Sequence, residues 1–527
     1  MPRRTFLTLP YELHHHIYKD YFILNDGYAF QPGSGKLATT DGQPLDLSLM
    51  YTCSFIASET KDLPLILNNI SFSTVYHPEW SAWAGRFDYL LNAQIEQQNC
   101  LVDHLARFIA PEIMSKIAAE YPWFVPQLEF VLRDRGYSRN WPLHRVYVSS
   151  RTWPLSKTLT ANPDNPFGRN HPAESALRQA ADFTLRLLAQ SSDEELVREI
   201  AETVGHWQGC RGLNDFLDQC YKPWDIPSWP SLNAMGTRFE DDELWSTMGH
   251  WHPSRGNEYR SKFRFSATAV AIRFLSHLSV EKRLCMRNLV IREDHIAVGQ
   301  QECHALGLIP FCKENSQLRV EIHVGMMSNL FQRMVLPKVR SFGELEACAV
   351  HSSGEVVFSR AIRNISSVVG SWLTEALALT DAGMPADSYT LTLDGESATD
   401  LCTDTFQQEV HRKVAMQLAV TRCHPCTPGM MRQDLFFLLN RKFPEALKHL
   451  ANQTSCLRSN FHPGNMWDVD RFIAHCGGHD INSFYTGFNS TTSYNFSTSI
   501  HVPRLGALLM ENYECRPCFR YPKKQHR

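Results

Sequence analysis

Two pairs of cysteines have the spacing of thiolate metal ligands. Cys423 and Cys426 form one C-x-x-C pair, and Cys515 and Cys518 form the other. Four thiolates could close a tetrahedral zinc site. The 88 residues between Cys426 and Cys515 far exceed zinc-finger spacing, so only the fold could bring the pairs together. A redox role would require Cys423 to lie at the N-terminus of a helix that follows a strand, where the helix dipole lowers the pKa of the thiol. The segment before Cys423 is instead expected to be a helix. We therefore predict no metal site and interpret these cysteines as ordinary core or surface thiols.

Histidines offer a second set of metal ligands. His250 and His252 would lie on one face of a strand, with the acidic residues 241–243 nearby in sequence. Because the chain holds 23 histidines, a chance pattern in a polar loop is the better interpretation. The run His14 to His16 lies on an expected short helix, where one ring packs and two face water. A metal- or thiol-dependent enzyme remains only as the less favoured alternative.

Familiar catalytic signatures are absent from the sequence. The segment 32–37 resembles the end of a phosphate loop, but Phe30 replaces the required glycine and Leu37 replaces the metal-binding Ser or Thr. We interpret it as a surface turn. No G-x-S-x-G, H-E-x-x-H or strand-linked G-x-G-x-x-G occurs. We therefore predict that the chain is not an enzyme, has no catalytic residue and needs no cofactor.

Composition restricts the partners and the location of the chain. The 527 residues are 43% hydrophobic, carry a net charge of −3 and have a pI near 6.8. This charge gives no field that would hold nucleic acid or an anionic membrane surface. No run of 18 apolar residues predicts a membrane span, and the start lacks the apolar core of a signal peptide. We expect a soluble protein of the cytoplasm or nucleus, with its 15 scattered cysteines reduced.

The first 80 residues are expected to form helix, loop, helix and strand. Leu9, Leu13, Ile17 and Tyr21 recur every four residues, which predicts a short amphipathic helix. Residues 25–46 are dense in turn formers and are predicted to be a loop. A second helix then follows Asp46, and residues 72–75 are predicted to form a strand.

The middle of the chain is expected to be helical. Apolar periodicity predicts helices within 91–132 and 173–188, and residues 192–195, with Ser192 and Glu195 at their ends, form a capping box before a further helix. Residues 152–172 and 221–262 are rich in Pro, Gly, Asn and Trp, so we predict loops that pack on the protein rather than flexible tethers.

The second half alternates between helical and strand patterns. A helix at 267–278 precedes strand-like runs at 286–291 and 318–322, whose separation suits a strand, crossover and strand unit. A helix at 365–379 precedes a strand at 389–393. The predicted class is α+β and mainly helical, with a βα-layered second half in which repeats stay an alternative. The predicted segments are 1–80, a module of helices; 81–262, helical with a loop-rich end; 263–481, mixed; and 482–527, low complexity with a basic tail.

The opening resembles the F-box-like proteins of fungi, a large family of unknown function. Leu9 to Leu13 with Ile17 and Tyr18 carry the first half of the resemblance, and Thr52, Cys53, Ile56 and Glu59 carry the second. The match covers about the first 75 residues. Segments 265–275 and 307–315 also resemble the later body of such proteins.

This resemblance implies a function in protein assembly. In the F-box family the first helices dock onto the Skp adaptor of a cullin ubiquitin ligase, and the rest of the chain holds a client protein. It assigns adaptor binding to Leu9, Pro10, Leu13 and Ile17. The insertion at 25–44 departs from the family by dividing the module. The alternative is a non-catalytic interaction protein in which the same stripe only packs the helix onto the domain that follows.

Overall fold

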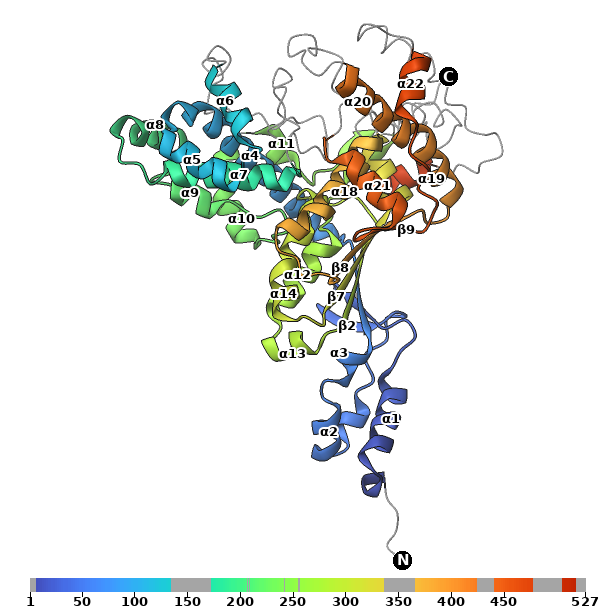
Figure 1. The fold of residues 1–527 in the computed structure, drawn as a ribbon. Coiled ribbons are helices and arrows are strands. Elements are labelled where there is room, and N and C mark those ends of the chain that lie inside the picture. The colour runs from blue at the N-terminus through green and yellow to red at the C-terminus, as the bar shows by residue number, and fades with distance from the viewer. Residues whose placement is uncertain are drawn as a thin grey trace, which may run out of the picture.

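The protein is built around one large sheet with helices packed against it (Figure 1). The structure is a computed structural model that describes residues 6–133, 172–335, 365–423, 440–476 and 505–517, except positions 206, 208, 241 and 255. Helices make up 58% of it, which confirms the prediction of a mainly helical chain. Among the described helices, none combines the length and the apolar character needed to span a bilayer.

The sheet has seven strands in the order β2-β1-β3-β6-β7-β8-β9. All neighbouring pairs are parallel except β1 with β2. The predicted βα layering of the second half is confirmed, because β6, β7 and β8 are adjacent and parallel. The fold is therefore mixed α/β with a mostly parallel sheet, and the predicted α+β segregation is corrected. The strands are β1 (Tyr28–Gln31), β2 (Lys36–Thr39), β3 (Asn69–Ser73), β6 (Asn288–Glu293), β7 (Arg319–Gly325), β8 (Tyr389–Asp394) and β9 (Leu457–Ser459).

The segment predicted to be a loop, residues 25–46, instead contains the hairpin β1–β2. Tyr28 pairs with Ile70 of β3, so the hairpin extends the edge of the sheet. The segment 32–35 turns between the two strands, as predicted for a surface turn. The prediction failed because each strand has only four residues, too few to show alternation among so many turn formers.

A block of helices lies in the sequence between the adjacent strands β3 and β6. The helix predicted after the capping box at 192–195 is present, but its cap is Asp193, whose Oδ1 accepts a 3.0 Å hydrogen bond from the amide of Leu196. The predicted segment 81–262 is thus inserted between strands contributed by 1–80 and 263–481. The helices are α4 (Pro78–Leu105), α5 (Pro111–Glu120), α6 (Val125–Arg133), α7 (Glu174–Leu188), α8 (Glu194–Val204), α9 (Leu213–Gln219), α10 (Trp229–Gly236) and α11 (Glu243–Thr247).

Two segments predicted to lack regular structure are folded in part. Residues 221–262 contain α10, α11 and the strands β4 (His252–Ser254) and β5 (Asn257–Ser261). Within 482–527, α24 (Leu505–Met510) precedes β10 (Tyr513–Pro517), which pairs with β5. The other predicted loop, 152–172, lies outside the described residues except for its last position. As predicted, the tryptophan-rich region packs on the rest of the chain, because Trp245 is buried.

Helices cover one face of the large sheet. On that face Ile291, Ile322 and Leu391 are buried, whereas Arg292 and Glu321 on the opposite face are exposed. Helix α12 (Ala267–His277) packs on β3 and β6. The sheet therefore has one apolar, covered face and one polar face. The remaining helices are α13 (Val280–Cys285), α14 (Ile309–Glu314), α15 (Gln332–Val335), α18 (Ile365–Asp381), α19 (Thr399–Thr405), α20 (His411–Cys423), α21 (Phe443–Asn452) and α22 (Val469–Cys476).

Candidate interaction surface

Three short helices project from one end of the sheet and form a unit that we call the N-terminal module (Figure 1). They are α1 (Tyr11–Phe22), α2 (Ser54–Thr60) and α3 (Leu63–Leu67). The module has a small core of its own, made by the buried side chains of Tyr18, Phe22, Ile56 and Leu63. Residues on both sides of the hairpin insertion therefore fold together.

A partly buried polar contact joins the two halves of the module. The hydroxyl of Tyr18 donates a 2.8 Å hydrogen bond to Oε2 of Glu59, 41 positions further along the chain. Nδ1 of His14 lies 3.5 Å from the same oxygen. Burial, followed by the contact with Glu59, raises the pKa of Tyr18. The first and second halves of the sequence motif are thus neighbours in space, and the insertion between them leaves their packing intact.

Helix α1 packs through a stripe next to the one that the sequence singled out. His14, Tyr18 and Phe22 face inward and are buried. Leu13 and Ile17 are 48% and 42% exposed, so nearly half of each side chain remains open to solvent. Of the other two predicted site residues, Pro10 is exposed and Leu9 is half-buried. Internal packing therefore uses only part of the surface of Leu13 and Ile17.

Exposed apolar side chains are concentrated in and around the module. Nine of the fourteen exposed large hydrophobic residues in the described part of the chain lie between positions 7 and 55. A concentration of exposed apolar side chains is a feature of interaction sites in folded proteins. The sequence did not single out the contribution of the second half of the module. The nine residues are Leu7, Tyr11, Leu13, Ile17, Tyr21, Ile23, Leu24, Tyr51 and Phe55.

Asn68 fixes the module to the sheet. Its buried Nδ2 donates to the carbonyl oxygens of Phe22, at 2.8 Å, and Pro64, at 3.0 Å. Its Oδ1 accepts a 2.8 Å hydrogen bond from the amide of Leu24. Since β3 begins at the next residue, one side chain ties the ends of α1 and α3 to a sheet strand. The apolar surface is thus presented from a fixed position.

Comparisons of the chain with protein-family models, curated proteins and solved structures find no match.

The histidines and cysteines considered as ligands do not form a metal centre in the described part of the structure. No three His, Cys, Asp or Glu side chains converge there in an arrangement suited to a metal ion. His250 and His252 are exposed. Cys423 and Cys515 are also exposed, while Cys426 and Cys518 lie outside the described residues. Whether the two cysteine pairs meet, which the sequence left open, therefore lies outside the described residues.

A serine and a histidine form a close pair that the sequence did not reveal. Oγ of Ser266 lies 2.6 Å from Nδ1 of His304, as a nucleophile and its base would. Both side chains are buried, and burial lowers the pKa of His304 to about 4. The Ser266 hydroxyl also accepts a hydrogen bond from the amide of Ala269, and Nε2 of His304 lies 2.6 Å from the carbonyl of Gly299. These bonds make the pair a cap for α12 that ties it to the following loop.

Proposed function

We propose that the chain is an F-box-like adaptor whose N-terminal module docks onto the Skp adaptor of a cullin ubiquitin ligase. The proposal rests on the exposure of Leu13 and Ile17 on a module whose inward face is made by other residues. The resemblance of the opening sequence supplies the kind of partner. Pro10 lies beside these two residues at the start of α1 and belongs to the same surface.

The energetics favour a protein partner for this surface. Fully burying a leucine or isoleucine side chain stabilises a complex by roughly 1.5–3 kcal/mol relative to leaving it in water. Leu13 and Ile17, one helical turn apart, can enter one groove together. Asn68 holds the helix in place, so little conformational entropy is lost on binding.

The polar face of the large sheet supports the second half of the proposal, that the body holds a client protein. Strand pairing aligns one residue from each of five strands in a continuous row across this face. An ordered row of polar side chains on a fixed sheet suits recognition of an extended segment of another protein. The row consists of Ser73, Arg292, His323, Thr392 and Arg458.

Co-purification with the Skp adaptor tests the proposal. The Leu13→Ala, Ile17→Ala double variant removes exposed apolar surface, so we expect wild type to retain the adaptor and the variant to lose most of it. Leu9 is left unchanged because it is half-buried.

The matched control is Val197→Ala, Met466→Ala, which removes two exposed apolar side chains outside the module. It should retain the adaptor as wild type does, and circular dichroism should show all three proteins folded. Equal recovery with wild type and the module variant, or no recovery with wild type, would contradict the proposal. The latter result would favour an interaction protein that works apart from a ubiquitin ligase.

A further inference from the structure

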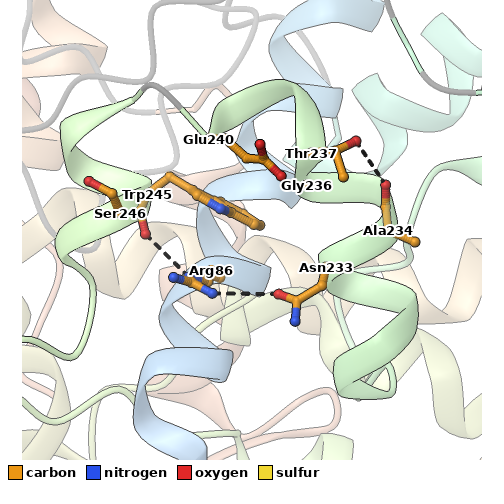
Figure 2. Close-up of a pocket in the computed structure, with 8 residues that line it drawn as sticks. All are labelled: Arg86, Asn233, Ala234, Gly236, Thr237, Glu240, Trp245 and Ser246. Atoms are coloured by element: carbon orange, nitrogen blue, oxygen red, sulfur yellow. Dashed lines mark hydrogen bonds between the residues drawn. The ribbon is translucent and has the colours of Figure 1, made fainter.

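A pocket lies between α4, α10 and α11, far from the N-terminal module in the fold (Figures 1 and 2). Its volume is about 500 Å³, within the range of roughly 300–1,000 Å³ typical of small-molecule sites. Arg86 of α4 forms one side, Asn233 and Gly236 of α10 another, and Trp245 and Ser246 of α11 a third.

Arg86 is held in place by two tryptophans. The centre of its guanidinium lies 5.2 Å from the ring centroids of both Trp229 and Trp245. Its Nε donates a 3.2 Å hydrogen bond to the carbonyl of Trp245, and Nη1 lies 3.5 Å from Oδ1 of Asn233. Aromatic rings and hydrogen bonds thus orient the cation before any ligand arrives.

The positive charge of Arg86 has no anionic partner among the described residues. No described carboxylate lies within ion-pair distance of it, and Glu240, which also lines the pocket, lies across the Trp245 ring (Figure 2). A guanidinium has five N–H donors, and the two bonds to Trp245 and Asn233 use only two of them. Burial lowers the pKa of Arg86. An acceptor that brings negative charge would satisfy these remaining donors.

The lining of the pocket indicates the charge of the ligand. The indole of Trp245 lies against α10 at Gly236, where a Cβ atom would overlap the ring, so the glycine permits this contact. The indole is buried there, so it offers no free face to a ligand. Arg86 is the one cation among the described residues that line the pocket, which matches a ligand with a single negative charge.

We propose that this pocket binds a small organic monocarboxylate, with its carboxylate on Arg86. A monocarboxylate matches one guanidinium better than a phosphate dianion, which would bring a second charge close to Glu240. This site is independent of the function proposed for the N-terminal module.

Isothermal titration calorimetry of the full chain with benzoate tests the proposal. We expect saturable binding with a Kd below about 1 mM. Benzamide, the neutral counterpart of similar shape, should have a Kd at least about tenfold higher. The affinity of the Arg86→Gln variant for benzoate should also fall about tenfold or more, because the change removes the charged donor.

Asn233→Asp is the sharper variant. It keeps the shape of the side chain that already contacts Arg86 and places a carboxylate beside the guanidinium. It should abolish benzoate binding while leaving thermal stability equal to or above that of wild type, so lost binding cannot be ascribed to unfolding. The Leu13→Ala, Ile17→Ala variant should bind benzoate as wild type does. No binding by wild type, equal binding of benzamide, or unchanged binding by Asn233→Asp would overturn the proposal.

Discussion

The hydroxyl of Tyr18 hydrogen-bonds the carboxylate of Glu59 at 2.8 Å and so joins two helices that the hairpin insertion separates in sequence. Tyr18 comes from α1 and Glu59 from α2, and both belong to the motif that resembles F-box-like proteins. Tyr18 has no exposed surface, and the side chain of Glu59 is 17% exposed. The contact gives these two residues of the motif a shared structural role.

Tyr18→Phe should destabilise the N-terminal module. The change keeps the ring but removes the donor, leaving Glu59 with His14 as its remaining described partner. A hydrogen bond to a charged group contributes about 1.5–3 kcal/mol, so a loss of this order is expected for the module. Hydrogen exchange of the α1 amides measures it. Tyr11→Phe, which changes an exposed tyrosine on the same helix, is the control. Equal protection in the two variants would show that the bond contributes nothing.

Asn68→Ala should loosen the module from the sheet. The variant leaves the Leu24 amide and the carbonyls of Phe22 and Pro64 without this partner. Unsatisfied buried groups cost about 1–3 kcal/mol, so α1 and α3 should exchange faster while the strands of the sheet stay protected. Asn69→Ala, an exposed neighbour, should have little effect. Unchanged exchange in the Asn68 variant would mean that the module is held by its apolar core alone.

Local sequence patterns predicted the helices and strands better than the contacts between them. The separation of the runs at 286–291 and 318–322 correctly indicated neighbouring parallel strands, because a crossover connection has a minimum length. Periodicity also placed α1 but selected its exposed stripe, since a four-residue repeat of apolar residues looks the same whether it faces a core or a partner.

Local sequence patterns could not predict the pocket at Arg86. Its partners Asn233 and Trp245 lie 147 and 159 positions away, in a region that the sequence predicted to be loops. No spacing rule connects residues that the fold alone brings together. The richness of that region in tryptophan was the available signal, and it correctly indicated packing on the protein.

Glu375→Gln should change how stability depends on pH. Burial raises the pKa of Glu375 to about 7 from an ordinary value of 4.5, although Ser175 donates to both of its oxygens. The folded chain therefore holds a proton between these values that the unfolded chain has lost. The stabilisation from this group is complete below pH 4.5 and is lost as the pH rises through 7, at most about 1.4 kcal/mol per pH unit.

The free energy of unfolding of wild type minus that of Glu375→Gln should therefore fall between pH 5 and pH 8. Urea unfolding at several pH values measures the difference, which cancels the contributions of other titrating groups. Glu112→Gln, at an exposed position, should give a difference that stays flat over the same range. A flat difference for Glu375→Gln as well would show that this carboxyl ionises as it does in the unfolded chain.

Arg292→Glu should alter which proteins the chain retains from cells. Arg292 is exposed in the middle of the polar row, where strand pairing places it beside Ser73 and His323. Reversing its charge changes the field along the row without touching the apolar core beneath the sheet. If the row contacts a client, quantitative affinity purification should lose that client while recovery of the Skp adaptor stays the same. Arg273→Glu, at an exposed position on α12, is the matched charge reversal and should retain the client. If both variants and wild type retain the same proteins, the client does not bind at this face of the sheet.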